Sequence, residues 1–216
     1  MNNLTFGNLF KKDSLVLIMK ILMPGILVVS LLVACSAIFK IEFGVFSQDV
    51  LPMPYIGILS NIGVIFWSVT IGILLFSYTF LERNGKDKSE NKFFFFAGLL
   101  TIFLLIDDFF EMHDNIFPRF LFISENWFYA IYAFSVLAIL YFYRKFILGT
   151  DYILLLLSLV FLGSSIFSDI ISALNINVPH LLIFEDGFKF LGITLWFAYF
   201  SRTSYKFVKQ EVSLKY

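Results

Sequence analysis

Residues 14–39 read SLVLIMKILMPGILVVSLLVACSAIF, an almost unbroken apolar run. A helix of about 20 consecutive apolar residues spans the hydrocarbon core of a bilayer. Lys11 and Lys12 precede the run, but it is too long for a signal-peptide core and ends in Lys40-Ile-Glu rather than in a small-residue cleavage site. We therefore expect a retained first transmembrane helix that is kinked at Pro24.

Five further apolar runs follow the first one along the chain. They cover residues 55–81, 93–113, 127–143, 152–174 and 181–200, and the loops between them are short. Hydrophobic residues make up 59% of the 216-residue chain and charged residues only 15%, against roughly 25% charged residues in a typical soluble domain. The sequence therefore predicts an all-α polytopic membrane helix bundle, a single transmembrane domain over residues 1–216 with about six transmembrane helices.

Basic residues are distributed unevenly between the two ends of the predicted helices. With the N-terminus in the cytoplasm, Lys40 and Arg119 are the basic residues placed in outer loops. The inner side then receives Lys11, Lys12, Arg83, Lys86, Lys88, Lys92, Arg144, Lys145, Arg202, Lys206, Lys209 and Lys215. Cytoplasmic loops of membrane proteins carry an excess of Lys and Arg. We therefore expect cytoplasmic N- and C-termini and a multi-pass protein of the cytoplasmic (inner) membrane.

Charge balance and cysteine count argue against two classes of function. The chain has 16 basic and 16 acidic residues, so it lacks the net positive charge that nucleic-acid binding requires. The single cysteine, Cys35, lies inside the first apolar run and has no second cysteine with which to form a disulfide. Redox chemistry through thiols is therefore not expected. The expected partners are membrane lipid and, beyond it, further copies of the chain or another membrane protein.

Charged and histidine residues gather at the predicted outer ends of the helices. They are Asp107, Asp108, Glu111, His113 and Asp114 on the third helix, Asp169 on the fifth, and His180, Glu185, Asp186 and Lys189 at the start of the sixth. A charge at membrane depth costs roughly 2.5–3.5 kcal/mol, so such groups face the bundle interior, a wet cavity or one another. We therefore expect these helix ends to converge.

Helical spacing orders part of this group. At about 100° per residue, Asp107, Glu111 and Asp114 lie within about 60° of one another and form an acidic stripe on the third helix. On the sixth helix, Lys189 follows Glu185 by four residues and can pair with it within the helix. The residues Glu185, Asp186 and Lys189 therefore form a predicted charge network.

Three interpretations of the group remain open. In the first, the charges are ion pairs and hydrated helix ends that serve stability alone. In the second they bind a divalent cation, because carboxylates and imidazoles are common metal ligands. The ligands would be Asp107, Asp108, Glu111 and His113, completed by Asp169, His180, Glu185 or Asp186. In the third, the residues line a polar cavity for moving or sensing an ion or proton.

Two functional hypotheses follow from these interpretations. The leading one is an outward-facing acidic and histidine cluster that binds a cation or a polar head group in a sensor, an assembly partner or a small channel component. The alternative is a metal-dependent membrane hydrolase of a lipid or lipid-linked substrate, with Glu111 or Asp169 as general base. The residues alone do not decide whether the chain is an enzyme, and a divalent cation is the one cofactor they point to.

Overall fold

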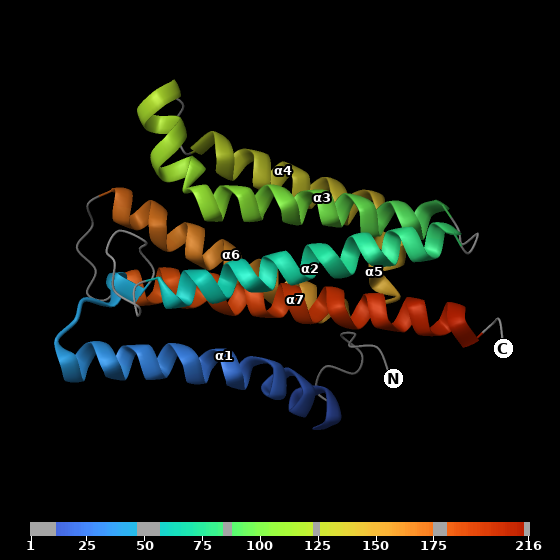
Figure 1. The fold of residues 1–216 in the computed structure, drawn as a ribbon, viewed down its shortest axis with the longest axis horizontal. Coiled ribbons are helices and arrows are strands. Elements are labelled where there is room, and N and C mark those ends of the chain that lie inside the picture. The colour runs from blue at the N-terminus through green and yellow to red at the C-terminus, as the bar shows by residue number, and fades with distance from the viewer. Residues whose placement is uncertain (1–11, 47–56, 84–87, 123–125, 175–180, 214–216) are drawn as a thin grey trace. The chain divides into compact units, whose positions relative to one another are not determined.

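The described part of the chain is helical throughout. The structure is a computed structural model that describes residues 12–46, 57–83, 88–122, 126–174 and 181–213 (Figure 1). Its elements are α1 (Lys12–Phe39), η2 (Phe43–Phe46), α2 (Ile58–Arg83), α3 (Lys88–Phe110), η3 (Met112–Leu121), α4 (Asn126–Phe142), α5 (Arg144–Leu148), α6 (Tyr152–Ala173) and α7 (Leu181–Ser213). The described residues contain no strand, so the all-α class predicted from the sequence is confirmed for them.

Four stretches of helix are long and apolar enough to cross a membrane. They are Asp13–Phe39, Ile58–Arg83, Ser89–Phe110 and Tyr152–Ser172. The apolar part of α4, Trp127–Phe142, is shorter. Helix α7 has charged residues on both sides of its apolar centre, with Lys189 before it and Arg202 after it. Six membrane crossings and cytoplasmic termini therefore remain predictions.

The chain divides into two compact units. Within the described residues, unit 1 lies in the ranges 67–152 and 199–213, and unit 2 lies in the ranges 12–66 and 153–198. Helices α2 and α7 contribute residues to both units. A single transmembrane domain stays a prediction from the sequence, and the two units are described separately below.

Unit 2 contains an apolar core. Leu32 of α1, Phe43 and Phe46 of η2, Leu59 of α2 and Phe190 of α7 form one buried cluster. Burial of each large apolar side chain contributes about 1.5–3 kcal/mol, so this cluster holds together elements that are distant in sequence.

A glycine in unit 2 allows α6 and α7 to approach closely. A Cβ atom at Gly192 of α7 would lie 2.6 Å from Cγ of Leu162 on α6. The Ser158 hydroxyl of α6 also donates a hydrogen bond of 2.8 Å to the Gly192 carbonyl oxygen. A close contact of this kind is typical of glycine at helix interfaces in membranes.

Unit 1 is held together by an aromatic cluster at the start of α3. Phe93 and Phe94 are fully buried. The ring centroid of Phe93 lies 4.6 Å from that of Phe146 in α5 and 6.0 Å from that of Phe200 in α7. Phe94 packs against Phe207 of α7 at 6.1 Å. These contacts bring the start of α3, α5 and the last part of α7 to the same end of the unit.

Helices α3 and α4 run side by side in unit 1 (Figure 1). Phe103 of α3 stacks against Phe128 of α4 with centroids 6.5 Å apart. Thr101 is the one polar residue between Phe93 and Asp107, and its hydroxyl donates to a carbonyl of its own helix. The 14 residue steps from Phe93 to Asp107 cover about 21 Å at about 1.5 Å per step. Unit 1 thus has an apolar middle between two helix ends that carry charge.

Candidate functional site

The end of α3 is marked by an abrupt change in backbone direction. Glu111 follows the last α3 residue with φ 47° and ψ 45°, a left-handed conformation that is uncommon outside glycine. The π-helix η3 begins directly after it and turns away from α3 (Figure 1). The predicted stripe through Asp107, Glu111 and Asp114 is therefore wrong, because regular α-helical spacing ends at Phe110.

Contacts between Asp107 and His113 stabilise the turn. Asp107 is buried, with 4% of its surface exposed. Its Oδ1 accepts a hydrogen bond of 3.0 Å from the backbone N–H of His113, and its Oδ2 lies 2.7 Å from Nδ1 of the same histidine. One carboxylate thus holds both the backbone and the ring of a residue on the far side of the turn. The Nδ1–Oδ2 contact has the distance of a charge pair rather than the geometry of an aligned hydrogen bond, and Nε2 is the second polar atom of the ring.

Aromatic rings from the start of α4 lie against this histidine. The His113 ring meets Tyr129 edge-on with centroids 5.8 Å apart and lies 6.5 Å from Phe128. Phe117 of η3 packs against Phe128 at 4.7 Å. These contacts attach η3 to α4 and place the imidazole in partly aromatic surroundings.

Two further carboxylates accompany the pair. Asp108 is half-buried and accepts a hydrogen bond of 3.2 Å from Nε1 of Trp67 in α2. Glu111 is half-buried within the turn itself. With a neutral imidazole, the segment from Asp107 to His113 carries three negative charges and no positive one.

The described geometry gives no support to a metal centre. Within residues 12–46, 57–83, 88–122, 126–174 and 181–213, no group of three or more histidine, cysteine, aspartate or glutamate side chains is arranged to hold a metal ion. Zinc takes at least three protein ligands in catalytic sites and four in structural ones. Asp107 and His113 form a pair, and Asp108 accepts from an indole. The divalent-cation site stays a hypothesis from the sequence.

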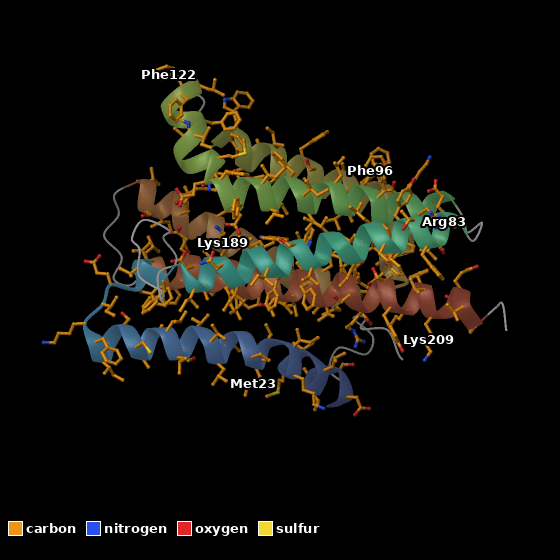
Figure 2. The ribbon with its side chains drawn as sticks, in the orientation of Figure 1. Met23, Arg83, Phe96, Phe122, Lys189 and Lys209 are labelled. Atoms are coloured by element: carbon orange, nitrogen blue, oxygen red, sulfur yellow. The ribbon has the colours of Figure 1, made fainter. Side chains whose placement is uncertain are left out.

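The other predicted site residues lie elsewhere in the chain. Asp169, Glu185, Asp186 and Lys189 belong to unit 2, and each is half-buried. Lys189, which is labelled in Figure 2, belongs to α7. His180 lies outside the described residues. Convergence of these residues with the end of α3 stays a prediction, whereas the Asp107–His113 pair stands within unit 1 alone.

A second charged cluster occupies the opposite end of unit 1. Asp151 immediately precedes α6, and its side chain is fully buried. Its Oδ2 accepts hydrogen bonds from Nε of Arg202 at 3.0 Å and from Nζ of Lys206 at 2.8 Å. The hydroxyl oxygens of Thr150 and Tyr199 are 3.0 Å apart beside it. We refer to Asp151, Arg202 and Lys206 as the basic cluster, because two cations share one carboxylate.

Sequence reasoning did not identify Asp151. Residues 149–151 have the composition of a polar turn, and Asp151 is separated from its two partners by 51 and 55 positions. The available signal was the spacing of Arg202 and Lys206, which places two cations on one face of a helix. That spacing predicts a shared partner but does not say which acidic residue provides it.

These features define a class of all-α proteins with several helices that can span a membrane and with charged groups at the helix ends. Residues 15–203 match a family described as a domain of unknown function, DUF8692, and the chain belongs to that family. No curated protein and no solved structure matches the chain. The family description names no activity, so a function has to be argued from the residues of this chain.

Proposed function

We propose that the chain is an integral membrane protein that binds a zwitterionic, ammonium-bearing lipid head group at the end of α3. The observation that carries the proposal is the Asp107–His113 pair, which lies against the aromatic rings of Phe128 and Tyr129. In this proposal the protein acts as a sensor of the lipid or as an assembly partner that the lipid helps to hold.

The chemistry of the segment matches both parts of such a head group. Carboxylates attract an ammonium group, and aromatic faces add a cation–π contribution of about 0.5–2 kcal/mol. Asp108 and Glu111 are the half-buried carboxylates of the segment. Because Asp107 engages Nδ1 of His113, Nε2 is the second polar atom of the ring, and it would donate to a phosphate oxygen from the imidazolium form, in which the ring adds one positive charge to the segment. An anionic lipid without an ammonium group would be repelled by the negative charge of the segment.

The position along α3 supports a head group as the ligand. The candidate membrane span Ser89–Phe110 ends directly before Glu111, so a membrane around this helix would place Glu111 and His113 at the level of the lipid head groups and Asp107 about one turn inside it. The excess of basic residues at the other end of the helices favours the outer leaflet for Asp107. Thr101 is the one polar residue between Phe93 and Asp107, and its hydroxyl donates to a carbonyl of its own helix, which favours a sensor or assembly role over a channel component.

Native mass spectrometry of the detergent-purified protein tests this proposal. Phosphatidylethanolamine and phosphatidylglycerol with the same acyl chains are supplied in equal amounts, and the retained lipid is identified by mass. We expect a preference for phosphatidylethanolamine that His113→Gln and Asp108→Asn both reduce. Glu82→Gln is the matched control. Glu82 is an exposed carboxylate at the C-terminal end of α2, where it accepts a hydrogen bond from the Tyr78 hydroxyl.

Two outcomes would overturn the proposal. One is equal retention of the two lipids by the wild-type protein. The other is about one metal ion per chain, measured by elemental mass spectrometry and lost in the double variant Asp107→Asn, Glu111→Gln. That result would assign the segment to a cation instead of a head group.

The Asp107–His113 pair also favours a second candidate function, hydrolysis of a lipid head group. An imidazole oriented by a buried carboxylate is the arrangement of a general base. In this chain the base would be His113 rather than Glu111 or Asp169, since His113 is the residue held by a buried carboxylate. Release of a water-soluble head group from labelled phosphatidylethanolamine, abolished by His113→Gln, would support hydrolysis. Intact lipid after prolonged incubation would exclude it for this substrate.

A further inference from the structure

The basic cluster carries more positive charge than its carboxylate neutralises. Arg202 and Lys206 both donate to the same oxygen of Asp151, so the three side chains together carry one net positive charge. The side chains of the two cations are only 15% and 18% exposed, and that of Asp151 is not exposed at all. Charge that is largely withdrawn from water is stabilised by a counter-ion.

The geometry of Arg202 leaves its phosphate-binding edge outside the ion pair. The guanidinium contacts Asp151 through Nε. The terminal nitrogens Nη1 and Nη2 are the atoms that form the two-pronged contact with a phosphate or carboxylate. An oxyanion can therefore bind to Arg202 without displacing Asp151.

The surroundings of the cluster are basic as well. Arg83, Lys92, Arg144, Lys145 and Lys209 are exposed at this end of unit 1, whereas the carboxylates of Asp151 and Glu211 are buried and that of Glu90 is half-buried. Figure 2 labels Arg83 on α2 and Lys209 on α7. Glu82 is the exposed carboxylate that this end presents among the described residues. The field that an approaching ion meets is therefore positive.

The nearby aromatic cluster indicates the level in the membrane at which the basic cluster lies. Phe93 begins the apolar stretch of α3 and packs against Phe200, which lies two residues before Arg202 on α7. Arg144 lies over the ring of Tyr141, at the end of α4, with Cζ 5.0 Å from the centroid. Cations that border an apolar stretch in this way lie at the level of lipid phosphates. The positive-inside rule places this end in the leaflet that is rich in anionic lipids.

We propose that Arg202 and Lys206, held in place by Asp151, bind the phosphate of an anionic phospholipid. Phosphate is a ligand chemistry that an anionic lipid and free inorganic phosphate share, and the position beside an apolar stretch commits the site to the lipid. This proposal does not depend on the head-group site at the end of α3, which lies at the other end of the unit.

The test is retention of phosphatidylglycerol by the full-length protein in native mass spectrometry, with phosphatidylcholine of the same acyl chains as competitor. The diagnostic variant is Arg202→Lys, which keeps the charge and loses the two-pronged fork. We expect it to lower the retention of phosphatidylglycerol about tenfold, which corresponds to the loss of one good polar contact. Lys209→Gln is the control, because it removes an exposed charge that lies over Tyr205 on the same helix.

The outcomes distinguish a specific phosphate-binding site from nonspecific attraction between charges. Loss of phosphatidylglycerol in Arg202→Lys, with retention in Lys209→Gln and an unchanged thermal midpoint in the absence of lipid, supports the proposal. Equal losses in the two variants overturn it, because attraction by net charge would then explain the binding. Thermal protection by millimolar inorganic phosphate equal to that by phosphatidylglycerol would overturn the assignment to a lipid. Asp151→Asn gives a second measurement: its lower stability should be restored by phosphatidylglycerol and not by phosphatidylcholine.

Discussion

Replacing Asp151 by alanine should be among the most destabilising single substitutions in unit 1. The change leaves Arg202 and Lys206 side by side without their shared carboxylate. Removal of one partner from a buried ion pair costs about 3–5 kcal/mol. The two cations keep 15% and 18% of their side-chain surface exposed, so water can solvate part of each charge. We therefore expect the free energy of unfolding to fall by about 2–4 kcal/mol.

The assay for this prediction is equilibrium unfolding in mixed detergent micelles, followed by far-ultraviolet circular dichroism. The double variant Asp151→Ala, Arg202→Met should recover part of the loss, because it removes one of the two cations that face each other. Glu82→Ala is the control: it deletes an exposed carboxylate and should change stability by less than about 0.5 kcal/mol.

Two results would refute this reasoning. A loss in Asp151→Ala no larger than that in Glu82→Ala would show that the buried carboxylate does not stabilise unit 1. A double variant with Arg202→Met that is less stable than Asp151→Ala alone would show that repulsion between the two cations is not the cause of the loss.

Further substitutions test other contacts by thermal unfolding. Gly192→Ala should cost about 1–3 kcal/mol through overpacking, because its Cβ would lie 2.6 Å from Cγ of Leu162. Gly163→Ala, whose Cβ would meet open space, should be neutral or slightly stabilising, and equal effects of the two would contradict the close approach of α6 and α7. Trp67→Phe removes the indole donor from Asp108 and should cost about 1.5–3 kcal/mol. An unchanged midpoint in this variant would show that the hydrogen bond contributes nothing measurable.

The helices were predictable where hydropathy alone determines them. The apolar runs from residue 14 and from residue 152 coincide with α1 and α6, because a continuous apolar stretch of this length forms a helix when it is shielded from water. Helix α7 continues to Ser213, well past the predicted end at residue 200. Helix α3 likewise begins at Lys88 rather than at residue 93. In both cases the extension is polar, so an apolar run does not mark where the helix begins or ends.

The candidate sites were predictable in part. The sequence singled out Asp107 and His113, but not their pairing, because uniform helical spacing does not anticipate the left-handed conformation of Glu111. The basic cluster depends on contacts over more than 50 positions. No local pattern links Asp151 to Arg202, so that site became visible only from the fold.

The most direct test of this account is to determine which end of unit 1 faces the outside of the cell. In a Cys35→Ser background, which removes the single native cysteine, Phe122→Cys and Lys209→Cys place one exposed thiol at each end. A membrane-impermeant maleimide is applied to intact cells and, separately, to lysed cells. The account predicts that Phe122→Cys is labelled in intact cells and that Lys209→Cys is labelled only after lysis. Labelling of both in intact cells, or of Lys209→Cys alone, would contradict the account.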